Sequence, residues 1–158
     1  MKKFYLVLLM IAIAIGGSAM IETLSLQELA ASSDLIVSAT MLGVKETGKT
    51  PEGVEICANL AEIAQVYKGD LKPGDKIKIK TFPGFEDGVA FAKDKDYLLF
   101  LQKQDNYYLV TNSVQGSWEI DADAKFLGMG TGKTIEDVKK AIDEKPLKFQ
   151  PKVPDLQL

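Results

Sequence analysis

The strand-like segments between residues 35 and 110 constrain the fold of this chain more than any other feature. Residues 76–80 read Lys-Ile-Lys-Ile-Lys, and this alternation is typical of a strand with one wet face and one buried face. Residues 97–101 read Tyr-Leu-Leu-Phe-Leu, an unbroken apolar run of strand length that indicates burial on both faces. The two patterns together predict a small β domain.

Further strands are predicted on either side of these two. Residues 35–42 are rich in β-branched side chains, residues 107–111 follow a polar turn and predict a hairpin, and residues 116–120 add a short last strand. In the long segment 54–67, the apolar positions change face near Leu60, which predicts a bulge or bend there. Long, bent strands allow a small sheet to close into a barrel.

Two helices are predicted at the ends of this β region. Ser25 and Glu28 have the spacing of a capping box at the start of a short N-terminal helix. Thr134 and Asp137 predict the start of a C-terminal helix, which Pro146 ends. The predicted fold is therefore mainly β: a five- to six-stranded antiparallel OB-like barrel with a short N-terminal helix and a C-terminal helix.

The N-terminal segment predicts export. Two lysines precede an apolar stretch that runs into small residues, so residues 1–19 read as a signal peptide cleaved before Met20. Residues 20–145 then form one OB-like barrel domain with flanking helices, and residues 146–158 form a Pro-containing tail. The expected location is secreted or cell envelope. The alternative is an uncleaved membrane anchor, because the low-polarity run approaches the length of a span.

The charged residues argue against nucleic acid as a partner. The chain has a net charge of -3, and loss of Lys2 and Lys3 with the signal lowers this to about -5. All nineteen basic residues are lysine, so the planar guanidinium that recognises phosphate in two-point fashion is absent. Residues 76, 78 and 80 form a lysine row, interpreted as the wet face of a strand; the alternative is a site for an acidic polymer or anionic membrane.

The absence of histidine and the single cysteine exclude many catalytic designs. No Ser-His-Asp or Cys-His arrangement can form, and no zinc site built on histidine or a cysteine cluster is possible. Cys57 lies in a strand-like stretch and is interpreted as a small buried hydrophobe rather than a reactive thiol. We therefore predict no enzyme activity, no cofactor and no metal site. The alternative is a metal-dependent enzyme that uses the carboxylates near Asp94 and Asp121.

The loop at residues 81–92 carries three phenylalanines in a polar, glycine-rich context. Long loops in compact domains often carry function, so Phe82, Phe85 and Phe91 are the candidate ligand-binding residues. The alternative is a loop that packs its own aromatic side chains beneath itself. Trp118, the only tryptophan, is interpreted as a core or barrel-end residue rather than a ligand platform.

Residues 128–134 read Gly-Met-Gly-Thr-Gly-Lys-Thr and superficially match a phosphate-binding loop. That loop requires a glycine where this chain has Leu127, and a buried parallel strand before it, where residues 121–125 are polar. The simpler interpretation is a flexible glycine loop that leads into the cap of the C-terminal helix.

Four segments carry a family resemblance: residues 33–40, 66–69 (Val-Tyr-Lys-Gly), 76–79 and 96–101. Their order is similar to that in a set of uncharacterised bacterial exported proteins. More distantly it resembles the netrin-like domains and the tissue inhibitors of metalloproteinases, whose fold is a five-stranded OB-type barrel flanked by helices. The resemblance implies the fold and an extracellular setting. In those inhibitors an N-terminal cysteine chelates the protease zinc, whereas the predicted terminus here is Met20, so no inhibitory residue is carried over.

The sequence leaves two classes of function open. The first is an exported non-enzymatic module that binds a protein or polymer in the cell envelope or outside it through barrel loops, chiefly residues 81–96. A membrane-tethered form of this module applies if the N-terminal segment is uncleaved. The second is the carboxylate-based metal-dependent enzyme.

Overall fold

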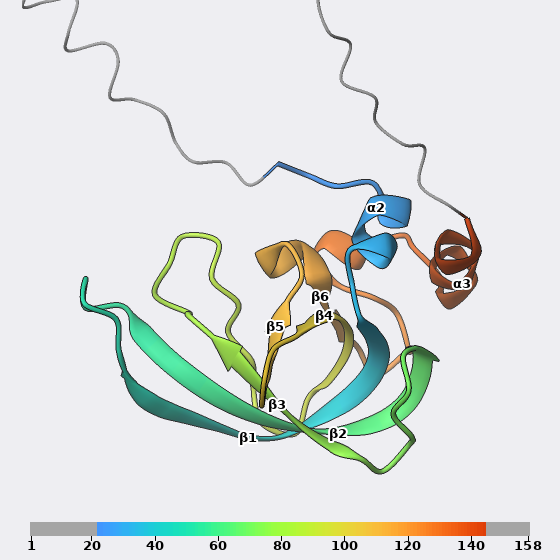
Figure 1. Ribbon diagram of the computed structural model, residues 1–158. Helices are drawn as coiled ribbons and strands as arrows, with labels where there is room; N and C mark the ends of the chain where they lie inside the picture. The colour runs from blue at the N-terminus through green and yellow to red at the C-terminus, as the bar shows by residue number, and fades with distance from the viewer. Residues whose placement is uncertain (1–21, 145–158) are drawn as a thin grey trace, which may run out of the picture.

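Six strands and two α-helices make up the protein in the computed structural model, which describes residues 22–144 (Figure 1). The helices are α2 (Leu26–Ala31) and α3 (Ile135–Asp143), and two 3-10 turns are η1 (Ser113–Gly116) and η2 (Gly128–Gly130). The strands are β1 (Leu35–Lys49), β2 (Glu55–Lys68), β3 (Lys76–Thr81), β4 (Asp96–Lys103), β5 (Tyr108–Val110) and β6 (Ser117–Ile120). The predicted signal peptide, residues 1–19, and the predicted tail, residues 146–158, lie outside the described residues.

Five of the strands close into a barrel. The order is β1-β2-β3-β5-β4, and β4 pairs back with β1, while β6 extends the sheet beside β4. This arrangement confirms the predicted mainly-β barrel with its two helices. One detail differs, because β3 and β5 run parallel and meet through a single residue pair, Ile79 with Tyr108. The barrel is therefore mixed rather than wholly antiparallel, and the joint between β3 and β5 is its least paired seam.

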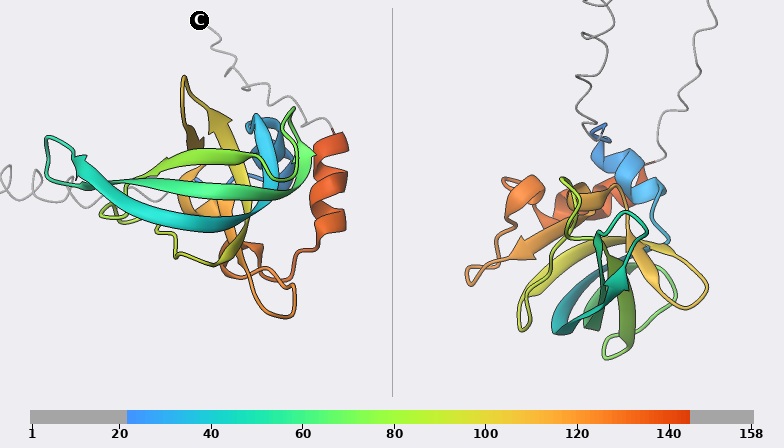
Figure 2. Two further views of the ribbon diagram at one scale, coloured as in Figure 1. Left: turned by 90° about the horizontal axis from the view of Figure 1, so that it is seen from below. Right: turned by 90° about the vertical axis from the view of Figure 1, so that its left-hand side faces the viewer.

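The hairpin of β1 and β2 is longer than the part of it that closes the barrel. Only the first part of β1, up to Thr40, pairs with β4, and the remainder pairs with β2 alone. The tip of the hairpin therefore extends beyond the barrel, as the left-hand view of Figure 2 shows. The residues of β1 from Val44 to Lys49 are exposed, which explains why this half of the strand is polar and glycine-containing.

The predicted change of face at Leu60 is wrong. Burial alternates without a break from Cys57 to Ile63, because the polar Asn59 occupies an inward position and Leu60 points outward with 43% of its surface exposed. The predicted bulge does lie beside Leu60, but its extra residue is Leu42 of β1, between the pairs Met41 with Ala61 and Gly43 with Leu60. Single unpaired residues also interrupt the register at Thr47 of β1 and at Ala64 and Tyr67 of β2.

The apolar residues form two cores on opposite sides of β4. Tyr97, Leu99 and Leu101 point into the barrel, whereas Leu98 and Phe100 pack on its outside beneath the two α-helices. All five are at most 5% exposed, which confirms the strand predicted to be buried on both faces. Trp118 is 1% exposed and contacts the rings of Phe100 and Phe126 in the outer core, so its predicted core role is confirmed.

Both helices begin at the predicted caps, and each cap is a capping box. The Ser25 hydroxyl accepts a hydrogen bond from the Glu28 amide, and the Glu28 carboxylate accepts one from the Ser25 amide. Thr134 and Asp137 make the same exchange at α3. No helix within residues 22–144 combines the length and apolar character needed to cross a bilayer.

Candidate functional site

The aromatic loop joins β3 to β4 and folds across the seam between β3 and β5. It separates the three candidate phenylalanines. Phe85 has 52% of its surface exposed and Phe82 is partly buried, whereas Phe91 is only 8% exposed and belongs to the barrel core. The Phe91 ring packs edge-on against Tyr97, with 4.9 Å between ring centroids. The candidate surface is therefore narrowed to Phe82 and Phe85.

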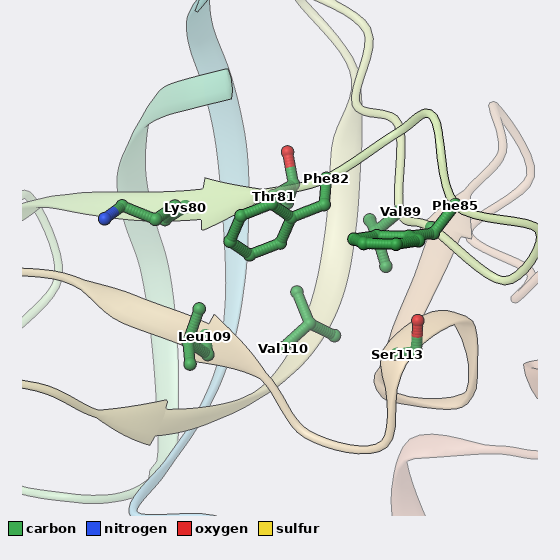
Figure 3. A pocket seen from close by; sticks show the side chains of 9 residues that line it. Lys80, Thr81, Phe82, Phe85, Val89, Leu109, Val110 and Ser113 are labelled. Carbon is green, nitrogen blue, oxygen red and sulfur yellow. The ribbon is translucent and has the colours of Figure 1, made fainter. Parts of the chain in front are cut away.

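A pocket of about 220 Å³ lies between this loop and β5 (Figure 3). Phe82 and Phe85 form one wall, with 6.1 Å between their ring centroids. Leu109 and Val110 of β5 form the facing wall. The remaining lining residues are Lys80, Thr81, Gly88, Val89 and Ser113.

Local hydrogen bonds fix the shape of the loop. The amide of Phe85 donates to the carbonyl of Phe82, and the amide of Gly88 donates to the carbonyl of Phe85, so two tight turns follow each other. Gly88 is required here, because a Cβ at this position would overlap the carbonyl oxygen of Phe82. The Ser113 hydroxyl donates to the carbonyl of Asp87 and ties the loop to η1. The phenylalanine pair is thus presented by an ordered loop.

The polar groups that line the pocket are mostly committed to other partners. The Thr81 hydroxyl accepts a hydrogen bond of 2.9 Å from the side-chain amide of Asn59, and the Ser113 hydroxyl bonds the loop as described. Lys80 stands at the rim, where its ammonium lies 4.2 Å from the centroid of the Tyr107 ring. The arrangement can therefore hold an apolar group, with one cation at the edge.

Sequence patterns pointed to the loop wall of this pocket but not to the opposite wall. Leu109 and Val110 read as ordinary apolar residues of a strand, and no local signal distinguishes them from core positions. They become a pocket wall because β3 and β5 diverge beyond their single paired position. Only the closure of the barrel brings β5 opposite the phenylalanines.

The carboxylates near Asp94 and Asp121 make local structural contacts. Asp121 accepts hydrogen bonds from the amides of Asp123 and Lys125, and Asp96 accepts one of 2.6 Å from the Thr40 hydroxyl. Within the described part of the chain, residues 22–144, no three Cys, Asp or Glu side chains are grouped closely enough to share a metal ion.

Cys57 lies on the inner face of β2 and is 4% exposed. Burial raises the pKa of its thiol to about 11, and the neighbouring Glu55 carboxylate, which accepts a hydrogen bond from the sulfur, acts in the same direction. A thiol that remains protonated at neutral pH is a poor nucleophile. The interpretation of Cys57 as a small buried hydrophobe is consistent with this environment.

A second, larger hollow of about 740 Å³ lies at the other end of β5 and is polar. Its lining includes Asp34, Asp70, Lys103 and Asp105. The Asp34 carboxylate accepts a hydrogen bond from the amide of Lys103 and so holds the end of β4. We assign no role to this hollow.

A scan against protein-family models finds no model that matches this chain. A search of curated proteins likewise finds no significant match. The arguments for function therefore come from the site itself.

Proposed function

We propose that this protein is an exported, non-enzymatic binding module that captures an apolar side chain of a partner protein between Phe82, Phe85 and β5. The observation that carries this proposal is the exposure of Phe85 beside a preformed apolar pocket. Exposed aromatic side chains that border a pocket are typical anchors of protein interfaces.

The size of the pocket favours a side chain over a cofactor. Pockets for small molecules and cofactors usually measure about 300 to 1,000 Å³, and this one measures about 220 Å³. A single large apolar side chain of a partner fits such a volume. The sparse polar lining offers no constellation of acid, base or nucleophile, which favours binding over catalysis.

The ordered loop supports binding because it reduces the entropy that is lost when a partner docks. The turns at Phe82 to Gly88 and the bond from Ser113 hold the phenylalanines in place before binding. A preorganised surface therefore retains more of its contact energy as affinity.

The proposed setting is the cell envelope or the outside of the cell, and it rests on the signal-like N-terminal sequence. A membrane-tethered form of the same module applies if that segment stays attached. Intact-mass measurement of the exported protein separates the two, because a species that begins at Met1 contradicts cleavage and one that begins at Met20 supports it.

The relation to the netrin-like domains and metalloproteinase inhibitors is part of the proposal only at the level of the barrel. The closed five-stranded barrel supports it. Fold alone does not transfer an activity, and no inhibitory residue has a counterpart here.

The test places a photo-crosslinking amino acid at Glu86, an exposed position next to Phe85, in the full chain in its producing cell. We expect a discrete crosslinked protein that disappears when Phe82→Ser and Phe85→Ser are introduced together. Phe91 stays unchanged in this design, because its replacement would disturb the barrel core.

The control replaces two exposed apolar residues on other surfaces, Leu60→Ser with Met129→Ser. The control should keep the crosslink, and circular dichroism should show that both double variants retain the wild-type fold. A crosslink that survives the loss of Phe82 and Phe85, or that is lost equally in the control, contradicts the proposal.

A further inference from the structure

The outer face of β1, β2 and β3 carries a lysine cluster of which only Lys80 also lines the pocket. The three strands lie side by side across the left-hand view of Figure 2, which looks onto this face from below. We call it the lysine face and define it by Lys45 of β1, Ala58 and Leu60 of β2, and Lys76, Lys78 and Lys80 of β3.

Strand register places these side chains together. Lys45 is paired with Ala58, and Ala58 is paired with Lys80, so the three occupy one row across the sheet. The next row contains Gly43, Leu60 and Lys78, and the third contains Thr40, Glu62 and Lys76. Directly paired residues share a face of the sheet. Lys45 of β1 therefore stands on one side of Ala58 and Leu60 of β2, and the three lysines of β3 stand on the other side.

The lysines of this face are available to an external anion. Lys45, Lys76 and Lys78 are exposed, and no ion pair within the described residues involves any lysine of the face. The first two rows contain no acidic residue, whereas the third contains Glu62 of β2 and continues through Thr40 to Asp96 of β4. Although the chain has a net charge of -3, this local cluster of cations attracts anions to this surface.

We propose that the lysine face binds an extended anionic polysaccharide. Lysines two residues apart on β3 stand about 7 Å apart, and β1 and β3 are separated by about 10 Å across β2. An extended polyanion that lies across the sheet can therefore contact several of these ammonium groups at once. The small residues Gly43 and Ala58 allow such a chain to approach the sheet closely, and Leu60 offers it one apolar contact.

Other anionic partners fit this face less well. Binding of single-stranded nucleic acid relies on aromatic side chains that stack with bases, and the three rows contain none. Membrane-surface binding relies on several large apolar side chains that enter the lipid, and this face offers only Leu60. Lysine ammonium groups act as point charges, which attract a polyanion without imposing one contact geometry.

The test measures binding of the full chain to sodium polygalacturonate, with neutral dextran as the uncharged control. A variant with Lys45→Gln, Lys76→Gln and Lys78→Gln is compared with a control of equal charge, Lys93→Gln, Lys103→Gln and Lys125→Gln, whose lysines are exposed elsewhere. Lys80 is left unchanged because it also lines the pocket.

We expect polygalacturonate binding that weakens as salt is added, and an affinity at least tenfold lower in the lysine-face variant. The slope of log affinity against log salt should fall by about 2, from three lost contacts at roughly 0.7 each, the value for single-stranded polyanions. The control should stay within about twofold of wild type. Absence of polygalacturonate binding, or an equal loss in both variants, overturns the proposal.

Two further measurements distinguish polysaccharide binding from nucleic-acid or membrane binding, and the lysine face from the proposed pocket. Tighter binding to poly-dT or to vesicles of equimolar phosphatidylglycerol and phosphatidylcholine than to polygalacturonate overturns the assignment to a polysaccharide. The variant with Phe82→Ser and Phe85→Ser should retain full polysaccharide binding. Loss of binding in that variant contradicts an independent lysine face, whereas retention supports it even if the pocket has no partner.

Discussion

Replacement of Gly130 by alanine should destabilise the outer core, because the added methyl group would overlap the ring of Trp118. Gly130 is buried in η2 and packs directly on the indole ring. A Cβ at this position would lie 2.4 Å from Cδ2 and 2.6 Å from both Cε3 and Cγ of Trp118. Ordinary carbon contacts require at least about 3.5 Å, so the indole must move by about 1 Å.

The surroundings of Trp118 resist such a movement. Its ring centroid lies 5.0 Å from that of Phe100 and 5.4 Å from that of Phe126, and its Nε1 donates a 2.7 Å hydrogen bond to the Gln115 carbonyl. Overpacking of a close-packed core costs about 3 kcal/mol at the upper end of its usual range. For about 120 ordered residues this corresponds to a fall in Tm of about 12 °C.

The assay is thermal and urea unfolding followed by the fluorescence of Trp118, which is the only tryptophan. The control is Gly48→Ala, because a Cβ at Gly48 has no atom within 4 Å and its φ is not in the left-handed region. We expect the control to change the stability by less than about 1 kcal/mol. A Gly130→Ala protein with unchanged Tm and unchanged tryptophan emission would refute the packing argument.

Three further predictions follow from the described contacts. Leu99→Ala should lower the free energy of unfolding by about 3 kcal/mol, whereas Leu60→Ala should cost under about 1 kcal/mol, as measured by urea titration. Thr134→Ala should cost about 1 kcal/mol at neutral pH, because it removes the hydroxyl that accepts from the Asp137 amide and donates to the Asp137 carboxylate. Hydrogen bonds from the backbone and the hydroxyl of Thr134 lower the pKa of Asp137, so the stability that they give the carboxylate is lost as the pH falls below its ordinary value of 3.8. The variant loses only the hydroxyl's bond to the carboxylate, so its cost should be smaller but not absent at pH 2, and a cost that rises at low pH contradicts this. The raised pKa of Cys57, about 11, predicts slow alkylation of the native thiol at neutral pH, and equal alkylation rates in native and unfolded protein contradict the buried placement. The same shift predicts that the free energy of unfolding falls as the pH rises from 9.0 to about 11, because the thiol ionises first in the unfolded chain.

The glycine loop at residues 128–134 illustrates what local patterns could and could not explain. The missing glycine at Leu127 was enough to reject a phosphate-binding loop. The reason for Gly130 was not visible in the sequence, because the ring that excludes a side chain there belongs to Trp118 of β6. A glycine requirement set by a distant residue leaves no local signal.

At the candidate site, too, the sequence identified one part and the structure supplied the rest. The three phenylalanines identified the loop, but a loop has no regular alternation of inward and outward side chains, so their spacing did not show which of them lies inside. The structure buries Phe91 against Tyr97 and leaves Phe85 exposed, and it supplies Leu109 and Val110 as the second wall.

Features that depend on neighbours along the chain were already determined by residue order: both capping boxes, the in-and-out alternation of β3 and the double burial of β4. Hydrogen bonds to the next turn and side chains that alternate every second residue need no distant partner. The parallel seam between β3 and β5, the inward position of Asn59 and the rows of the lysine face were decided only by closure of the barrel. Register between strands that are distant in sequence depends on how the whole core packs, and a single strand does not encode it.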